Sequence, residues 1–374
     1  MYEHLNLEII LFFMFYAAVA MMALMASCYL LFRDGNAFAA HISSPIRLRR
    51  WTAAFFASIA FGHVWYLPTY FLSSSHDVLL CGLVGGLLDC LTFFPLEIVI
   101  LLAMLQDRKR PLWPIALMLA PPVVGMAWGV INCSDALMPM IRIYFLLLSI
   151  SLIIYMVREV RQYGRWLRDN YADLEHKEVW QSFLVLTVIF IASDFYVGGY
   201  GLPVYEYVSQ SYAIVLICYL LWRVETLSDL SVSQPILHEE EKTTSTENEE
   251  SDALPLSISS NIGTLLKQYC EQPRLYLQYD ISLSRLAMEI GTNRYYLSQY
   301  FSSQGLNYNA YINDLRVNHF ISLYHEAIAA QRSFTVQQLA MESGYRSYNT
   351  FSDAFKRRTG QSVTAWMRTM SEKK

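Results

Sequence analysis

The sequence predicts an all-α chain in which a seven-helix transmembrane bundle is followed by a double helix-turn-helix domain. Three observations lead to this prediction. The first 222 residues hold only 28 of the 60 charged residues, and long uncharged runs lie between them. A six-residue motif that starts at Leu286 returns 53 residues later. An acidic segment separates the two parts, so the predicted domains are residues 1–222, 223–260 and 261–374.

Seven apolar stretches in the first part are long enough to cross a bilayer. Residues 9–32 contain no charged side chain, and a helix needs about 20 apolar residues to span the hydrocarbon core. This stretch is too long for a signal peptide. The other six stretches are residues 51–72, 78–105, 112–131, 136–157, 179–200 and 203–222. Prolines inside the stretches predict kinks at Pro68, Pro95, Pro121 and Pro122.

Lysine and arginine occur in alternate loops of the bundle. The loops after the first, third and fifth stretches carry twelve of them, whereas the N-terminal segment and the other loops carry none. Short loops rich in lysine and arginine stay in the cytoplasm. We therefore expect the N-terminus outside and everything after Trp222 in the cytoplasm. The outer loops are too short to form a ligand-binding domain of their own.

Residues 223–260 have two basic and nine acidic side chains and few apolar residues. This composition predicts a solvated, flexible linker. An alternative is an autoinhibitory segment that imitates the charge of DNA, and it rests on charge alone.

Residues 261–374 reverse the balance, with thirteen basic and eight acidic side chains, which suits a partner made of phosphates. Their internal repeat pairs Leu286-Ala-Met-Glu-Ile-Gly291 with Leu339-Ala-Met-Glu-Ser-Gly344. In each copy a short helix, 282–290 or 335–343, ends at a glycine able to take a left-handed turn. A second helix follows two or three residues later, which is helix-turn-helix geometry.

Apolar residues in the two copies have the spacing of a shared core. They are Leu286, Leu297 and Phe301 in the first copy and Leu339, Phe351 and Phe355 in the second. The small Ala287 and Ala340 permit close approach of the second helix. Cys270 is expected to be a small buried hydrophobe.

With these features, roughly residues 265–370 resemble the DNA-binding domain of AraC/XylS-type transcription regulators. The most specific stretch is Gly344-Tyr345, Tyr348-Asn-Thr-Phe-Ser-Asp-Ala-Phe-Lys-Arg-Arg-Thr-Gly360 and Trp366. Matches to the first unit are Tyr295-Tyr-Leu-Ser-x-x-Phe301, Gly305, Tyr311 and Leu315-Arg316. One departure is Val363, where the family usually has proline near the start of the last helix. The resemblance implies a joining helix, from Tyr311 to about Ala330, that holds two recognition helices about 34 Å apart.

The resemblance also implies which residues contact double-stranded DNA. Candidates for reading base edges are Tyr295, Ser298, Gln299, Tyr348, Asn349, Ser352 and Asp353. Asn349 and Gln299 suit bidentate reading of adenine, and Asp353 suits a cytosine amine. Candidates for phosphate contacts are Arg294, Arg346, Lys356, Arg357 and Arg358. The alternative for each residue is a solvated helix face.

Ionisable residues inside apolar stretches are costly in a bilayer and are therefore candidates for function. Five in the outer half predict a polar sensor pocket for a small-molecule effector: His63, Asp89, Arg142, Asp194 and Glu206. The alternative is a structural ion pair between Arg142 and Asp194 within an interfacial belt of tyrosines. A disulfide between Cys81 and Cys133 is left open.

No residue spacing indicates a zinc site, a phosphate-binding glycine loop or a nucleophile elbow, so we expect no cofactor and no enzyme activity. The sequence predicts a membrane-anchored, sequence-specific transcription regulator in the inner membrane of a bacterium. Its bundle senses a signal through a direct motion, through a homodimer or through proteolytic release of the tail. The alternatives are a transporter or membrane enzyme with an appended DNA-binding module, and a tether that senses nothing.

Overall fold

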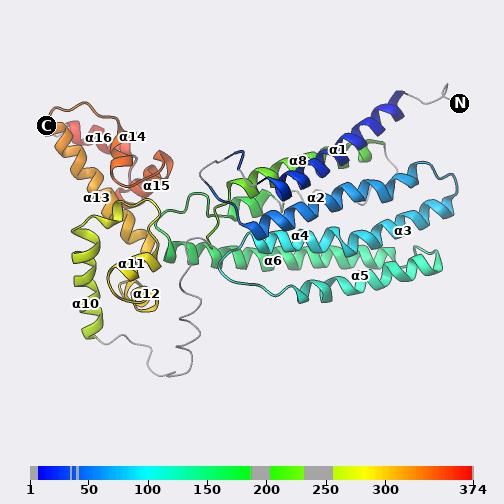
Figure 1. Cartoon of the computed structure of the whole chain (residues 1–374), viewed down its shortest axis with the longest axis horizontal. Coiled ribbons are helices and arrows are strands. Elements are labelled where there is room, and N and C mark those ends of the chain that lie inside the picture. Colours follow the sequence, from blue (N-terminus) through cyan, green and yellow to red (C-terminus); the bar gives the residue numbers. More distant parts are fainter. Residues whose placement is uncertain are drawn as a thin grey trace. The chain divides into compact units, whose positions relative to one another are not determined.

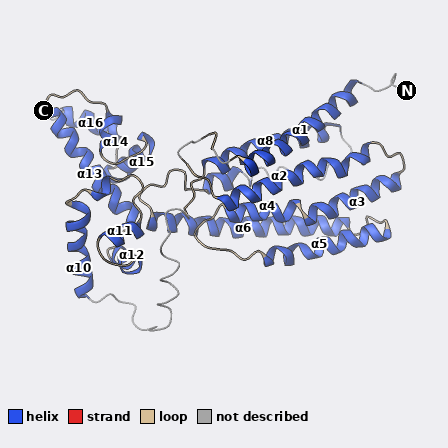
Figure 2. Cartoon of the chain, in the orientation of Figure 1, coloured by secondary structure: helices blue, strands red, loops and turns tan. Residues whose placement is uncertain are grey.

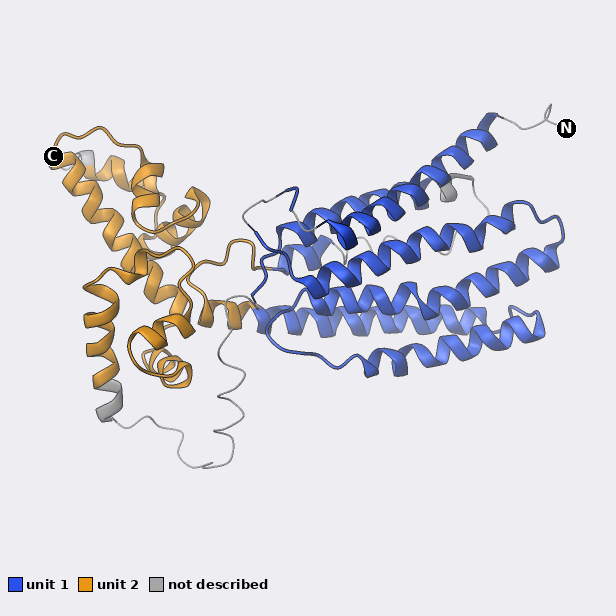
Figure 3. Ribbon diagram, in the orientation of Figure 1, with its two compact units in different colours: residues 1–163, 179–231 blue, residues 164–178, 232–374 orange. Residues whose placement is uncertain are grey.

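The computed structural model describes residues 7–33, 36–38, 42–185, 187, 203–230 and 256–372. Over these residues every regular element is a helix (Figure 2), and an isolated antiparallel bridge joins Tyr171 to Ser282. The predicted all-α class is therefore confirmed. The chain forms two compact units (Figure 3): unit 1 is Met1–Tyr163 with Val179–Ser231, and unit 2 is Gly164–Glu178 with Val232–Lys374. Residues 164–178, which the sequence places in a loop of the bundle, group with unit 2.

Unit 1 is built from long apolar helices (Figure 1). They are α1 Leu7–Phe32, α2 Ile46–Tyr66, the short 3₁₀ helix η1 Leu67–Tyr70, α3 Ser75–Leu91, α4 Phe93–Ala103, α5 Trp113–Asn132, α6 Met138–Asn170 and α8 Pro203–Thr226. The last seven residues of α6 belong to unit 2.

The predicted count of seven spans is only partly matched. Five segments of the described chain are long and apolar enough to cross a membrane: Leu7–Phe32, Ser75–Ala103, Trp113–Asn132, Met138–Asn170 and Tyr207–Thr226. The second predicted span is a helix, α2, but it begins with three arginines in five residues and is not among these segments. Most of the sixth predicted span, 179–200, lies outside the described residues.

Regular α-helical geometry is interrupted near two of the four prolines. The chain passes from α2 into η1 at Leu67, with Pro68 in the first turn of η1. Between α3 and α4 the backbone leaves helical geometry at Thr92 (φ −122°, ψ −63°), three residues before Pro95. Proline has no N–H for the carbonyl four residues earlier, which weakens the helix at that point. By contrast, α5 continues as one helix through Pro121 and Pro122.

A buried ion-pair network ties the loop between α4 and α5 to α6. The guanidinium groups of Arg108 and Arg110 lie 2.8 and 2.7 Å from the carboxylate of Glu159, and Arg110 also lies 2.9 Å from Asp107. Glu159 is only 6% exposed. Because a buried charge is costly without a partner, the two arginines stabilise this loop in addition to carrying the predicted cytoplasmic charge.

The described residues of unit 2 form the end of α6 and nine further helical elements. They are α10 Leu256–Leu266, the π turn η2 Lys267–Glu271, the 3₁₀ turn η3 Leu275–Leu277, α11 Leu283–Glu289, α12 Arg294–Ser303, α13 Tyr308–Ala329, α14 Val336–Glu342, α15 Tyr348–Thr359 and α16 Val363–Glu372. The predicted short helices 282–290 and 335–343 correspond to α11 and α14. The predicted joining helix corresponds to α13, which begins three residues earlier than expected.

Local sequence signals define these boundaries. A side-chain oxygen immediately before each of five helices accepts a hydrogen bond from the backbone N–H three residues on, over 2.8–3.3 Å. The residues with this N-capping role are Ser282, Asn293, Asn307, Thr335 and Ser347. Each satisfies a donor that has no partner inside the helix. Gly291 and Gly344 follow α11 and α14 with φ of 72° and 90°, so both helices end at the left-handed glycine that the repeat predicted.

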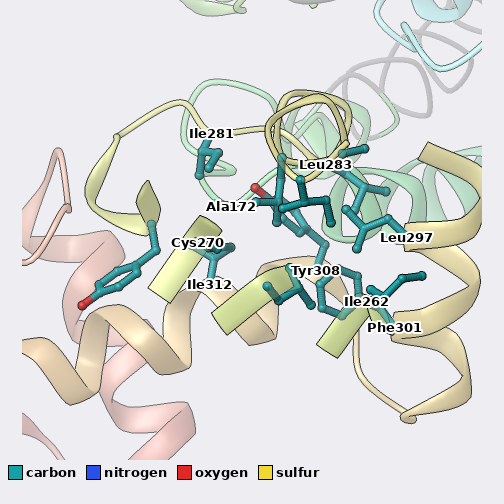
Figure 4. Packing of buried hydrophobic residues seen from close by; sticks show 14 residues of the cluster. Ala172, Ile262, Cys270, Ile281, Leu283, Leu297, Phe301, Tyr308 and Ile312 are labelled. Carbon is teal, nitrogen blue, oxygen red and sulfur yellow. The ribbon is translucent and has the colours of Figure 1, made fainter. Parts of the chain in front are cut away.

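Two hydrophobic cores lie along α13. The first contains Leu286, Leu297 and Phe301, together with Tyr308 and Ile312 from the beginning of α13 (Figure 4). The second contains Leu339, Phe351 and Phe355, together with three residues from the rest of α13, namely Val317, Phe320 and Tyr324. The six core residues predicted from the repeat are all buried. One helix therefore supports both helix-turn-helix units.

The last helix, α16, starts without the proline that the family usually has. It begins at Val363, and the Ser362 hydroxyl accepts a hydrogen bond from the Ala365 backbone N–H over 3.3 Å. Val363 is 2% exposed and belongs to the second core. The serine supplies an N-terminal hydrogen bond, and the branched side chain contributes packing.

Candidate nucleic-acid interface

In each of the two helix-turn-helix motifs of unit 2, the second helix buries one face and exposes another. Leu297 and Phe301 of α12, and Phe351 and Phe355 of α15, lie in the two cores. Tyr295 is 65% exposed and Tyr348 is 37% exposed, one near the N-terminus of each helix. These N-terminal ends are the parts of a recognition helix that reach base edges in a major groove.

The seven candidate base-reading residues differ in accessibility. Tyr295, Tyr348, Asn349 and Asp353 are exposed, whereas Ser298, Gln299 and Ser352 are half-buried. All seven lie on α12 or α15, away from the core-facing positions. The four exposed residues have the accessibility that direct contact with DNA requires. The roles assigned to the seven residues stay predictions.

Three of the five candidate phosphate-contacting residues are engaged by other side chains of unit 2. The Nε of Arg294 donates to the Asn170 side-chain oxygen over 2.9 Å. Arg346 lies 2.8 Å from the Asp280 carboxylate, and Arg358 lies 3.2 Å from Asp314. Lys356 and Arg357, in the last turn of α15, are exposed and form no ion pair within the described part of the chain.

Asp280 stays ionised between two cations. Burial by itself raises the pKa of this carboxyl, but the charges of Lys177 and Arg346 and their hydrogen bonds outweigh burial and bring the pKa below its usual value. Below that pKa the carboxylate is protonated and both ion pairs are lost. At neutral pH, Arg346 is therefore paired with a negative charge that a DNA phosphate would have to replace.

Arg316, which in the sequence is only part of a motif, has a specific structural role. It is 1% exposed, and its guanidinium donates to the carbonyl oxygens of Tyr276 over 2.8 Å and Gln278 over 2.7 Å. The same group lies over the ring of Tyr345 at 5.5 Å. Burial lowers the pKa of Arg316, and nearby groups, first Tyr345, oppose this change. Arg316 links the segment before α11 to the turn of the second helix-turn-helix.

A sequence signal for Arg316 does exist. Tyr308, Ile312, Phe320 and Tyr324 recur every four residues along one face of α13, and Arg316 occupies the middle of this buried stripe. A charged residue in the register of an apolar stripe is buried with partners. Which distant carbonyls accept hydrogen bonds from Arg316 is visible only in the folded structure.

Four of the five predicted sensor residues lie on described helices of unit 1, and contacts are described for two of them. The Nε2 of His63 lies 2.8 Å from the Gln210 side-chain oxygen, and the Tyr16 ring lies 4.4 Å from the His63 ring. Asp89 accepts a hydrogen bond from the Tyr66 hydroxyl over 2.7 Å. These contacts join α2 to α1, α8 and α3.

The other sensor residues are only partly placed. Arg142 lies on α6 and Glu206 on α8, where only the backbone of Glu206 is described. Asp194 lies outside the described residues, and with it the alternative Arg142–Asp194 ion pair. The sensor pocket stays a prediction. All six cysteines are free, so the disulfide between Cys81 and Cys133 is not formed. Among the described residues, no group of three or more histidine, cysteine or acidic side chains is arranged to hold a metal ion.

The comparison with known families agrees with this geometry. Residues 286–369 match the family model described as a helix-turn-helix domain, which is of the AraC type. The match runs from α11 into α16 and includes both repeat copies. No curated protein and no solved structure matches the chain. The N-terminal region contains several apolar helices that are consistent with a membrane domain. The chain carries an AraC-type helix-turn-helix DNA-binding domain at residues 286–369.

Proposed function

We propose that this chain is a membrane-anchored, sequence-specific transcription regulator. The observation that carries the proposal is the combination, in one chain, of a double helix-turn-helix domain with five segments, among the described residues, that are long and apolar enough to cross a bilayer. The domain binds promoter DNA from the cytoplasmic side of a bacterial inner membrane, with the N-terminus of the chain outside. The confinement of lysine and arginine to alternate loops supports this orientation.

The two recognition helices are α12 and α15. In this proposal Tyr295, Ser298 and Gln299 read bases at one half of the site, and Tyr348, Asn349, Ser352 and Asp353 read the other half. Lys356 and Arg357 contact phosphates without first breaking an ion pair, because neither has an ion-pair partner among the described residues. Arg294, Arg346 and Arg358 reach phosphates only after leaving the partners described above.

The bundle is proposed to sense a small polar effector in its outer half, through His63, Asp89, Arg142, Asp194 and Glu206. Binding shifts the population of conformations in which the DNA-binding domain is available. A second copy of the chain adds to this effect, because two neighbouring tails raise the effective concentration at a paired site.

Base reading is tested with the full chain in detergent and a fluorescent duplex from its own upstream region, at fixed salt. Asn349→Ala removes a bidentate contact, so we expect a loss of about 1–3 kcal/mol that is confined to one base position. Arg357→Ala removes a phosphate contact and weakens all sequences about equally, lowering the slope of log affinity against log salt by about 1. Competition by single-base variants of the duplex distinguishes the two patterns.

Lys267→Ala serves as the matched control, because Lys267 is a basic residue of the same unit outside both recognition helices. Its affinity and salt slope should equal those of the unmodified chain. Equal affinity of the unmodified chain for upstream and random duplex would refute sequence-specific binding.

A further inference from the structure

A short segment that begins at the last residue of α6 packs against the helix-turn-helix domain within unit 2. We call residues 170–177 the docked segment. Tyr171 pairs with Ser282 in an antiparallel bridge, and the Ala172 N–H donates to the Ile281 carbonyl over 3.4 Å. The Asn309 side chain on α13 donates to the carbonyls of Ala172 and Tyr171 over 2.7 and 3.3 Å. Three backbone groups of the segment, the Ala172 N–H and the carbonyls of Tyr171 and Ala172, thus bind partners more than a hundred residues away in the sequence.

The docked segment also contributes to a hydrophobic core. Ala172 is 1% exposed and belongs to the first core of the domain (Figure 4). Asn309, which holds the segment, is 9% exposed. A buried amide that lost these two acceptors would be left without hydrogen bonds. Docking is therefore specific in its backbone contacts as well as in its packing.

Side chains of the docked segment reach the N-terminal ends of both recognition helices. The Asn170 side-chain oxygen accepts from the Nε of Arg294, the first residue of α12. The Glu175 carboxylate accepts from the hydroxyl of Thr350, the third residue of α15, over 3.1 Å. The same ends of α12 and α15 must enter the major groove in the proposed function. The Glu175 carboxylate thus lies at the N-terminal end of α15.

A third contact runs through Asp280 to Arg346, which precedes α15. Lys177 of the docked segment lies 3.4 Å from Asp280, and Asp280 lies 2.8 Å from Arg346. Lys177 thus helps to hold the carboxylate that occupies Arg346. Three groups at the N-terminal side of the recognition helices, Arg294, Thr350 and Arg346, are engaged by or through the docked segment.

We propose that the docked segment and duplex DNA are mutually exclusive occupants of this surface, so that docking holds the domain in a state of low DNA affinity. This inference rests on the proposed function, and it names the contact that controls it. When the segment is released in only a fraction of the molecules, the apparent dissociation constant for DNA equals the intrinsic constant of the released state divided by that fraction. Because the docked segment begins at the last residue of α6, a change at the end of that helix alters the fraction.

The first experiment locks the segment in place in the full chain. Residues opposite one another in an antiparallel pair have Cα atoms about 4.5–5.5 Å apart, within the range that a disulfide bridges. We combine Tyr171→Cys with Ser282→Cys and measure DNA affinity after oxidation and after reduction. We expect oxidation to lower the affinity by about 10- to 100-fold and reduction to restore it. Each single variant, which retains the six native cysteines, should not respond to oxidation.

The second experiment releases the segment. Asn309→Ala removes both hydrogen bonds to the docked backbone, so DNA affinity should rise several-fold with an unchanged ratio of specific to random binding. Asn318→Ala, on an exposed position of the same helix, is the matched control and should leave the affinity unchanged. Should Asn309→Ala fail to fold, the disulfide lock still decides the question. Unchanged affinity of the locked chain would overturn the proposal.

A third measurement separates this inference from the proposed function. The rate at which the Tyr171→Cys, Ser282→Cys chain forms its cross-link is followed with and without duplex DNA. A random duplex at low salt suffices, because phosphates alone drive such binding. Slower cross-linking at saturating DNA supports mutual exclusion. It does so even if upstream and random duplexes bind with equal affinity, which would refute sequence-specific binding but not mutual exclusion. An unchanged rate at saturating DNA refutes mutual exclusion.

Discussion

Gly344 and Gly291 occupy the same place in the two repeat copies, but the structure makes different demands on them. Both are left-handed, with φ of 90° and 72°. A Cβ at Gly344 would lie 2.9 Å from the Cα and carbonyl oxygen of Leu277, whereas a Cβ at Gly291 would meet no atom within 4 Å. Gly344 is therefore required for its backbone conformation and also for the close approach of η3.

This difference predicts unequal effects of alanine. Gly291→Ala should cost about 1–2 kcal/mol, the cost of a left-handed conformation for a residue with a Cβ. Gly344→Ala should cost more, because the Leu277 backbone must also move. Hydrogen exchange of the α13–α15 amides in the full chain measures the opening free energy of this region. Equal losses of protection in the two variants would contradict the packing described around η3.

Single residues also show where sequence reasoning succeeds. Cys270 was predicted to be buried and is 0% exposed, and burial, with the nearby charge of Glu271, raises the pKa of its thiol to about 12. The thiol is therefore not a nucleophile at neutral pH. The role of Arg316 was not predicted, because its acceptors, Tyr276 and Gln278, lie about 40 residues away and only the fold brings them together.

At the scale of elements, the short helices of the tail were predictable because their boundaries are encoded locally. Ser282 and Thr335 cap the first helix of each copy, and Gly291 and Gly344 follow it. The contact of the docked segment was not predictable, because its partners are 103 to 175 residues distant. In sequence, residues 170–177 resemble any polar loop of a bundle.

The sequence predicted that the apolar stretches form helices, but it predicted the number of helices less well. The stretch 78–105 reads as one span, but a break at Thr92 divides it into α3 and α4. Hydropathy reports burial from water and not the continuity of backbone hydrogen bonds, so it did not locate this break. Pro95 supplied the local signal.

Helix α6 contains both a predicted sensor residue and the first residue of the docked segment, so the proposed function assigns signal transmission to it. Arg142, a predicted sensor residue, lies near its beginning, and Asn170, the first residue of the docked segment, is its last residue. Arg142→Ala should therefore change the output of a promoter reporter while membrane expression stays normal. Ser151→Ala, at an exposed position of the same helix, should not. Unchanged output from both variants, with lower stability for Arg142→Ala, would favour a structural role for Arg142.

At the scale of the whole molecule, the formal net charge of −4 conceals parts of opposite sign. Residues 1–222 carry a net charge of −2, residues 223–260 carry −7 and residues 261–374 carry +5. The basic part coincides with the helix-turn-helix domain, as phosphate binding requires. Five of the seven apolar stretches overlap segments of the described chain that are long and apolar enough to cross a bilayer. Composition alone thus predicts two kinds of domain in one chain.

The central claim is that one intact chain holds a specific DNA sequence while embedded in a bilayer. The most direct test captures upstream and random duplexes on the full chain reconstituted in lipid nanodiscs, at physiological salt. We predict retention of the upstream duplex with about 1,000-fold or greater preference over random DNA, and loss of this preference with Asn349→Ala. Equal retention of both duplexes, or specific binding only after the tail has been cleaved from the nanodisc, would contradict the claim.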